Sequence, residues 1–494
     1  MMWDGVAKDP DHPTREYHWN HFDALRVENG MIKEHWDEAV INAAPACGAN
    51  RQLGRSKMAY LLWSARPNST KKPHNLGKLA LIFATALFAA LGTPQESQAQ
   101  NMAITNTRII VGNGQVIEHG AILVRDGRIV AVVSGEAPAV PAGTQTIDAS
   151  GFTVMPGFID DHRHLIGRAD NFFENRANRE MMELLESGVT TVQSGGDPFP
   201  AIVQLKRKIE SGEIKGPRIV APGPLNFNKY QTVDDLRAAI DEEIKGGADS
   251  LGEVHFPEAT FPAEPTEKET AFLKVAIDEG KKLDVPVQIH AVSPSAMLDA
   301  VRDGGTELIH TPHFGWLTDE DAQTVKNAGA LVSSCTGFGA PVFDVFNHDN
   351  IPTFRDGKPW PRAIIDGQGR GREAGYKPVN GRTLFDNGVV YGYCTDTTYQ
   401  ATAALAQELR VLNLMFSPVD LIKIMGPNSA DVIGKSKDIG TLEAGKLADI
   451  VVLTGNPLEG YWNLLTDVMT IKGGQVLVDK RSQLQTIKVL PAPR

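Results

Sequence analysis

Short apolar runs alternate with longer amphipathic runs across residues 153–437, and this rhythm limits the folds open to the chain. Eight apolar runs have strand length, at residues 154–159, 189–193, 218–221, 250–254, 287–290, 308–310, 331–334 and 389–393. Helical periodicity lies between them, as at residues 175–186, 234–244, 267–282, 294–302 and 319–328. Eight strand–helix units predict an α/β fold with a TIM-like (β/α)8 barrel. A doubly wound sheet is the alternative, but no G-x-G-x-x-G follows the first run, which weakens a dinucleotide-binding interpretation.

Segments rich in short β runs flank this region on both sides. Before it stand residues 104–110, 120–124 and 128–132, and after it stand residues 448–453, 468–471 and 475–478. The turn pair Asp126-Gly127 directly precedes one of these runs and is typical of a tight hairpin. We therefore predict that residues 100–152 and 438–485 form one small β-sandwich domain, and that residues 153–437 form the barrel.

The beginning of the chain is predicted to contain a β-hairpin. The runs 17–27 and 31–40 are separated by Asn29-Gly30, a pair typical of hairpin turns. Residues 2–45 resemble the last strands of a SnoaL-like (polyketide-cyclase-like) domain, although a whole domain of that kind is much longer. Residues 1–57 are therefore interpreted as a domain fragment or a spurious extension. Their histidines are interpreted as strand-face side chains, because no carboxylate or cysteine spacing accompanies them.

Residues 70–99 have the pattern of a secretory signal peptide. A basic stretch at residues 71–78 precedes the apolar run 79–91, and small residues follow up to Ala99. The apolar run is shorter than the ~20 residues of a membrane span, so no stable membrane anchor is expected; a buried core helix is the alternative. If this signal is used, the mature protein starts near Gln100 and is periplasmic or secreted. Otherwise the protein is cytoplasmic.

Charge and cysteine content exclude two further classes. The formal net charge is −11, which argues against a nucleic-acid partner, because phosphate binding needs clustered Lys and Arg. The three cysteines are Cys47, Cys335 and Cys394. They share no C-x-x-C spacing, so neither a disulfide framework nor a Cys-type zinc site is expected.

The most specific chemical motif is Asp161-His162-Arg163-His164, which follows the first apolar run. Residues i and i+2 of a strand face the same side, so the two imidazoles can reach one metal ion. Further candidate ligands stand at or near other strand ends, namely Glu253, His290, His310 and Asp396. Catalytic residues of (β/α)8 barrels come from the C-terminal ends of strands. Because His and carboxylate ligands suit Zn, Fe or Mn, we predict a metal centre there.

These residues resemble the metal-dependent amidohydrolase superfamily, and the resemblance covers about residues 103–485. It rests on His162-x-His164, His290, His310 and Asp396, and on the segment 440–453. The imidazolonepropionase-like and enamidase-like members are nearest in pattern. The resemblance implies cleavage of a C–N bond of an amide, cyclic amide or peptide by a hydroxide formed on the metal. A lactone or phosphotriester hydrolase with the same centre and a non-catalytic scaffold are the alternatives.

The resemblance also implies two divalent metal ions, with Zn as the default. One ion would be held by His162, His164 and Asp396, and the other by His290 and His310. Many members bridge the ions with a carboxylated Lys on the fourth strand, but that strand has no Lys here, so Glu253 is predicted to bridge. A one-ion site with Glu253 outside the ligand set is the alternative. Asp396 would also carry the proton from the attacking water to the leaving nitrogen.

Two more histidines and one loop complete the candidate site. His255 faces the same way as Glu253 and is a candidate for substrate or metal contact, and His313 competes with His310. Deaminases of the superfamily often carry His-x-x-Glu on the fifth strand, but Ser293 stands at that last position, which favours amide hydrolysis. The aromatic and Arg-rich segment 337–387 is interpreted as a structureless active-site lid or as a surface loop. A small molecule is the expected substrate, and the sequence does not decide whether the protein forms a homo-oligomer.

Overall fold

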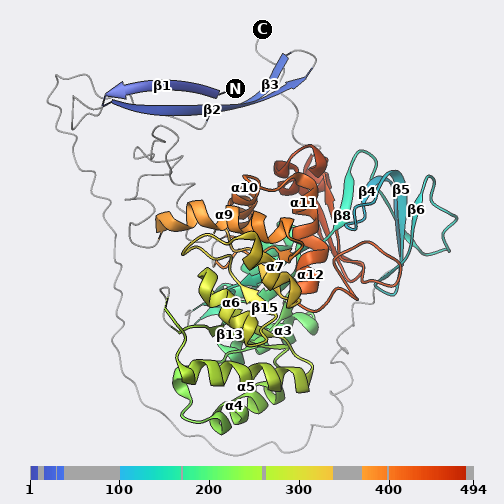
Figure 1. Cartoon of the computed structure of the whole chain (residues 1–494). Coiled ribbons are helices and arrows are strands. Elements are labelled where there is room, and N and C mark those ends of the chain that lie inside the picture. The colour runs from blue at the N-terminus through green and yellow to red at the C-terminus, as the bar shows by residue number, and fades with distance from the viewer. Residues whose placement is uncertain are drawn as a thin grey trace, which may run out of the picture.

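The computed structural model describes residues 101–167, 171–258, 263–337, 370–397 and 400–484, together with the backbone of three N-terminal strands (Figure 1). These are β1 (Met2–Lys8), β2 (Glu16–Glu28) and β3 (Met31–Asp37), which form an antiparallel sheet in that order. The predicted hairpin is thus present as β2 and β3. The predicted signal peptide lies outside the described residues.

Short parallel strands form the centre of the main body. One sheet has the order β11-β10-β9, and a six-stranded sheet runs from β12 to β17 in chain order. Their bounds are β9 (Phe158–Arg163), β10 (Val189–Ser194), β11 (Arg218–Val220), β12 (Pro222–Gly223), β13 (Ser250–His255), β14 (Val287–His290), β15 (Glu307–Ile309), β16 (Leu331–Ser333) and β17 (Val390–Gly392). Every one of the eight predicted apolar runs overlaps a strand of these sheets.

The two parallel sheets do not join into one closed barrel within the described residues. The break lies at Ala221, between β11 and β12, and Pro222 begins β12 with no N–H to continue a ladder. On the opposite side, the segment that follows β17 is hydrogen-bonded to β9. The Asp161 N–H donates to the carbonyl of Tyr393 and the Asp396 N–H to that of His162, each at 2.9 Å. The predicted α/β fold is confirmed, while the described residues of the TIM-like (β/α)8 barrel form two parallel sheets in chain order and no closed barrel.

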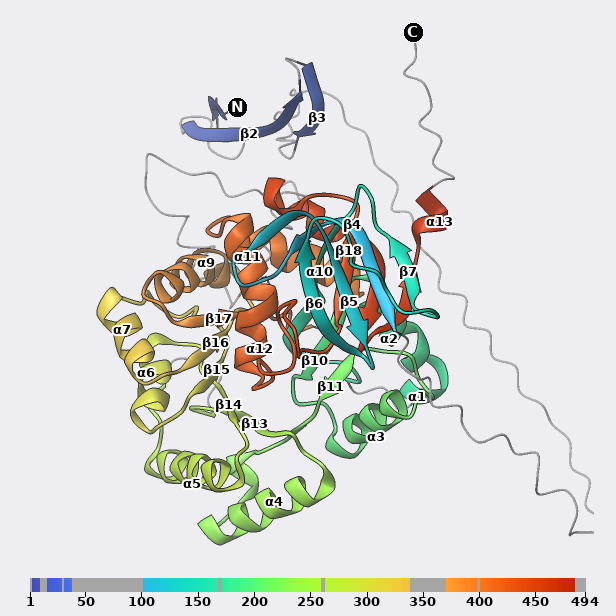
Figure 2. The ribbon, with the colours of Figure 1, turned by 90° about the vertical axis from the view of Figure 1, so that its right-hand side faces the viewer.

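Helices cover the outer side of the parallel strands, and Figure 2 shows α3 to α7 along this side. The described helices here are α1 (Phe172–Asn175), α2 (Ala177–Glu186), α3 (Phe199–Glu210), α4 (Val233–Gly246), α5 (Glu267–Leu283), α6 (Pro294–Arg302), α7 (Asp319–Asn327), α10 (Ala401–Leu412), α11 (Pro418–Lys423) and α12 (Ser429–Val432). Thr232, Thr266 and Thr318 form capping boxes that begin α4, α5 and α7. One large apolar core lies between these helices and the strands.

Strands from both sides of the parallel region form a second structural unit. Its sheet has the order β20-β19-β18-β8-β4-β5-β6, and β7 pairs with β4. The bounds are β4 (Met102–Ile110), β5 (Val116–Arg125), β6 (Arg128–Ser134), β7 (Gln145–Asp148), β8 (Thr153–Pro156), β18 (Ile450–Leu453), β19 (Asp467–Lys472) and β20 (Gln475–Asp479). Because all these strands belong to one sheet, the predicted β-sandwich is not confirmed.

The first predicted barrel strand, at residues 154–159, is divided between the two units. β8 pairs antiparallel with β18, whereas β9 pairs parallel with β10. Gly157 lies between β8 and β9, and a Cβ at this position would overlap the side chain of Thr190. The prediction of a single strand was wrong, because hydrophobic periodicity does not indicate which sheet each half of an apolar run will join.

Part of the segment predicted to be structureless is helical. α9 (Arg370–Asp386) occupies its last residues. The side-chain amide of Asn380 donates to the carbonyls of Pro312 and Gly315 at 2.8 and 2.9 Å, so α9 is fastened to the loop after β15. Most of the rest of the predicted lid lies outside the described residues.

Two of the three cysteines, Cys335 and Cys394, form a buried disulfide between the ends of β16 and β17, with Cα atoms 4.8 Å apart. Sequence spacing gave no sign of this pair, because 59 residues separate the two positions and only folding brings them within bonding reach. In the part of the chain that the structure describes, no helix is long and apolar enough to span a bilayer.

Candidate metal centre

The six side chains predicted as ligands come together at the C-terminal ends of the parallel strands. Each is supplied by a different strand end except for the first two, which share β9: His162, His164, Glu253 (β13), His290 (β14), His310 (after β15) and Asp396 (after β17). The parallel strands therefore bring four histidines and two carboxylates, from the ends of five strands, to one edge of the fold.

Their ligand atoms form two overlapping groups. His162, His310 and Asp396 make one group, and Glu253, His290 and His310 make the other, with the ligand atoms in each lying within 4.8 Å of one another. His310 belongs to both. His164 belongs to neither, although its Nε2 lies 3.1 Å from Oδ1 of Asp396.

Glu253 lies between the two groups. Its Oε1 is 2.5 Å from Nδ1 of His290 and 3.3 Å from Nε2 of His310, and its Oε2 is 3.7 Å from Nε2 of His162. One carboxylate oxygen thus faces each group, which is the position that a bridging ligand needs.

The electrostatics of the centre favour ionised carboxylates. Burial alone would raise the pKa of Glu253, but the charges of His290 and His162 hold this pKa well below its usual value. Burial opposes ionisation of Asp396 as well, and the charge of His310 together with the nearby rings of His162 and His164 lowers the pKa of Asp396. For His162, burial would lower the pKa, but the negative charge of Glu253 and contacts with Asp396 raise it to about 9.

The residues present fit divalent metal ions. Both ring nitrogens of His162 are buried, and neither has a hydrogen-bond partner among the described residues. Leaving a buried polar atom without a partner costs ~1–3 kcal/mol, and a ligand role for His162 accounts for this arrangement. Imidazole and carboxylate donors are those that Zn, Fe and Mn accept, and metal binding would displace the proton that these carboxylates hold on His162.

The two remaining candidate histidines lie beside the centre and outside both ligand groups. The ring of His255 stacks on that of His290 with centroids 4.3 Å apart. The backbone N–H of His313 donates to the carbonyl of Val292 at 2.9 Å. Burial and the nearby charge of Lys377 lower the pKa of His313 to about 2. The geometry therefore places His310, rather than His313, among the candidate ligands.

A buried carboxylate that the sequence analysis missed holds the loop after His164. Asp197 accepts hydrogen bonds from three consecutive backbone N–H groups, those of Leu165 at 2.7 Å and of Ile166 and Gly167 at 2.9 Å. Its Oδ2 also accepts from the Ser194 hydroxyl at 2.9 Å. The only available signal was the position of Asp197 just after the second strand, and many loop residues share that signal.

A second missed group fixes Asp396. The backbone N–H and the hydroxyl of Thr395 donate to Asp160 at 3.0 and 2.7 Å, and the Arg163 guanidinium donates to the Thr395 hydroxyl at 3.0 Å. Two residues of β9 that flank the candidate ligand His162 thus hold the backbone next to Asp396. Arg163 stands between the two histidines of the motif and Asp160 just before it, but the motif assigned neither residue a role.

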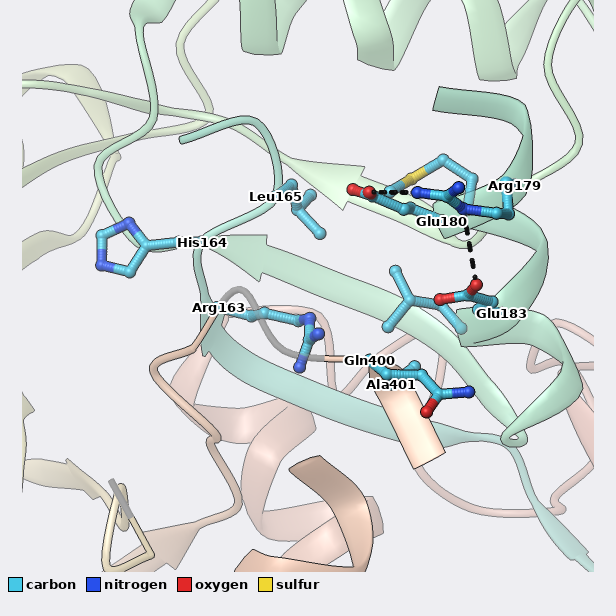
Figure 3. Close-up of a pocket in the computed structure, with 10 residues that line it drawn as sticks. Arg163, His164, Leu165, Arg179, Glu180, Glu183, Gln400 and Ala401 are labelled. Atoms are coloured by element: carbon cyan, nitrogen blue, oxygen red, sulfur yellow. Dashed lines mark hydrogen bonds and ion pairs between the residues drawn. The ribbon is translucent and has the colours of Figure 1, made fainter. Parts of the chain in front are cut away.

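A pocket of about 330 Å³ opens beside His164. It is lined by Arg163, His164, Leu165, residues of α2 including Arg179, Glu180 and Glu183, and Gln400 and Ala401 at the start of α10. Figure 3 shows the His164 ring turned away from α2 and the Arg163 side chain directed toward the α2 and α10 side of the pocket. The pocket is thus polar and carries both signs of charge.

Comparison with known proteins identifies relatives of similar architecture. Residues 153–477 match the amidohydrolase family. A 5-methylthioadenosine/S-adenosylhomocysteine deaminase of Halalkalibacterium halodurans is 23% identical, over 71% of this chain and 84% of the relative. An imidazolonepropionase of Caldanaerobacter subterraneus subsp. tengcongensis is 22% identical, over 73% and 91%. The solved structure of a Xaa-Pro dipeptidase with bound methionine in its active site has a TM-score of 0.62 and 21% identity, over 77% of this chain and 100% of that one.

Proposed function

Because the chain belongs to the amidohydrolase family, we propose that it hydrolyses a C–N bond of an amide, cyclic amide or peptide with the help of bound divalent metal ions. The observation that carries the proposal is the convergence of His162, His310 and Asp396, and of Glu253 and His290 around the same His310. A non-catalytic scaffold would have no need to keep this full set of ligands at one edge of the fold.

We propose two ions, with Zn as the default metal. One would be held by His162, His164 and Asp396, and the other by His290 and His310, with Glu253 between them. The support is that the two oxygens of Glu253 face different ligand groups. When bound, such ions lower the pKa of coordinated water and polarise the carbonyl of the substrate.

Asp396 is the group that would move the proton. Its carboxylate is buried, and its lowered pKa keeps it ionised and able to accept a proton. Its Oδ1 lies 3.1 Å from Nε2 of His164, the one candidate ligand that also lines the pocket. Asp396 would take a proton from the attacking water and donate it to the departing nitrogen.

Amide hydrolysis is favoured over deamination by the role of Ser293. This residue stands where superfamily deaminases often carry Glu, and its hydroxyl accepts a hydrogen bond from the Ala296 N–H at 3.2 Å as the N-cap of α6. A serine hydroxyl does not exchange a proton at neutral pH as a Glu carboxylate can, so Asp396 is the available proton carrier.

The test compares the full chain with Glu253→Ala and with a matched control, Glu118→Gln, at an exposed surface ion pair. Each protein is loaded with Zn, and metal content and hydrolysis of cyclic amides, N-acyl amino acids and dipeptides are measured. We expect about two ions per chain in the wild type and the control, and a joint loss of metal and activity in Glu253→Ala. One ion per chain with near-normal activity in Glu253→Ala would contradict bridging. Activity on lactones or phosphotriesters alone would contradict the reaction class.

We also propose that residues 70–99 act as a signal peptide and that the mature enzyme is periplasmic or secreted. The support is the basic, apolar and small-residue pattern of that segment. Mass spectrometry of the protein from its native cells tests this, and peptides from residues 1–57 in the mature form would count against it.

A further inference from the structure

We propose that the Cys335–Cys394 disulfide is a positioning element of the metal centre: it holds Asp396 in its working place, so that the oxidised protein is active and the reduced protein is not. The pair lies where two ligand-bearing strand ends meet. Cys335 follows β16 and Cys394 follows β17, two residues before Asp396. Both cysteines are fully buried and pack against Ile309, the neighbour of His310.

The segment that carries Asp396 is held from two sides. Toward β9, the Asp396 N–H donates to the carbonyl of His162 at 2.9 Å, and Thr395 is bound to Asp160. Toward β16, the segment is held by the disulfide and by hydrogen bonds with Ser334, whose hydroxyl accepts from the Cys394 N–H at 3.0 Å and whose N–H donates to the carbonyl of Gly392 at 2.9 Å. The disulfide is therefore the one covalent link on that side.

The backbone is held in an unusual conformation at Cys335 and at Asp396, two residues beyond Cys394. Asp396 has φ +46° and Cys335 has φ +42°, a left-handed region that non-glycine residues seldom adopt. Such conformations cost ~1–3 kcal/mol and persist where the surroundings impose them. A covalent bond beside both residues is one part of the surroundings that can do so.

Reduction changes the space that the two sulfurs need. It adds two electrons and two protons, breaks one S–S bond and leaves two thiols. A bond of ~2.05 Å becomes a nonbonded contact of at least ~3.5 Å, and both cysteines are fully buried. We expect the two sulfurs to separate partly by displacement of the ends of β16 and β17, and a displacement of ~1 Å can cost ~10²-fold in rate.

The same pair connects the site to cellular location. Disulfides persist in oxidising compartments and are rare in the cytosol, and residues 70–99 have the pattern of an export signal. Oxidation needs an acceptor of two electrons and two protons, which a disulfide-bonded oxidoreductase supplies by thiol–disulfide exchange. The chain would thus stay inactive in the cytoplasm and become active after export.

The first measurement is a thiol count on the denatured full chain. With three cysteines in the chain, we expect one reactive thiol, Cys47, before reduction and three afterwards. Zn affinity is then measured by competition with a chromogenic chelator, before and after reduction of the native protein with a phosphine. We expect at least a tenfold weaker Zn affinity after reduction, and recovery after reoxidation.

Activity adds a second readout that rests on the proposed function. We expect kcat to fall by about 10- to 100-fold on reduction, with a smaller change in KM, at a temperature where the circular dichroism spectrum is unchanged. A disulfide that only stabilised the fold would shift the unfolding midpoint and leave kcat and Zn affinity as they were. Cys47→Ser should respond to reduction like the wild type.

The double variant Cys335→Ser/Cys394→Ser should have weak Zn affinity that reduction does not change further. If this variant does not fold, reversible reduction of the wild type still decides. Free thiols at both Cys335 and Cys394 in protein recovered from an oxidising compartment, or unchanged Zn affinity after complete reduction, would overturn the proposal. If the oxidised protein cleaves no amide, the proposed function fails, while the thiol count and Zn affinity still decide the role of the disulfide.

Discussion

Replacing Asp197 by Ala is expected to destabilise the protein and loosen its metal centre together. Asp197 is 2% exposed, and its carboxylate accepts hydrogen bonds from the N–H groups of the loop that directly follows His164. The substitution removes the acceptor and leaves the donors in place. It therefore tests whether this loop depends on one side chain for its position.

The size of the effect follows from the number of donors left without a partner. The N–H groups of Leu165 and Ile166 belong to residues that are each 3% exposed, and an unsatisfied buried donor costs ~1–3 kcal/mol. These two alone predict a loss of ~2–6 kcal/mol in the free energy of unfolding. Asp197→Asn keeps one carbonyl oxygen in the same place, so its loss should be clearly smaller.

Urea unfolding followed by circular dichroism measures this loss, and chelator competition measures Zn affinity on the same samples. Asp278→Ala is the matched control, because Asp278 is exposed on α5 and surface changes of this kind stay within ~0.5 kcal/mol. We expect weaker Zn binding in Asp197→Ala than in the control. A loss of under about 1 kcal/mol with unchanged Zn affinity would refute the reasoning, since such orphaned donors cost more than that.

Two further predictions concern groups inside the parallel strands. Burial raises the pKa of Glu307 from 4.5 to about 8, so the unfolded chain loses this proton at a lower pH than the folded protein does. The protonated Glu307 therefore contributes its full stability below pH 4.5. Between pH 4.5 and about 8 this stability falls by up to ~1.4 kcal/mol per pH unit. Unfolding titrations at several pH values should show a flatter decline in Glu307→Gln, and an identical pH slope in the two proteins would contradict this. Gly392→Ala should lower the free energy of unfolding by ~1–3 kcal/mol, because the new Cβ would overlap Oδ2 of Asp161. Urea unfolding measures this change, and an unchanged midpoint would contradict the prediction.

The convergence of the candidate ligands could be predicted from the sequence, because it depends on local pattern. Strand ends can be read from the end of an apolar run, and catalytic groups of such folds stand at those ends. The chain order of strands then brings His162, Glu253 and Asp396 to the same edge without further information. The structure places all three within the same cluster of side chains.

Features that depend on distant partners could not be predicted in this way. The division of residues 154–159 at Gly157 depends on pairing with β18, which lies near the other end of the chain. The disulfide depends on the approach of β16 and β17. Asp197 resembles any loop aspartate until the backbone N–H groups that it binds are in place. In each case the deciding contact is made by folding, and no local periodicity encodes it.

The pairing of β8 with β18 bears on the synthesis of the chain. β8 is complete at Pro156, but its partner begins only at Ile450, so almost the entire parallel region must be translated in between. At ~5–20 residues per second the wait is roughly 15–60 s. Throughout that time β8 presents an unpaired apolar edge, a template for wrong pairing. A truncated chain that ends before Ile450 would leave this edge of β8 exposed, and we expect chaperones and proteases to bind it, whereas β18 covers the edge in the complete sheet.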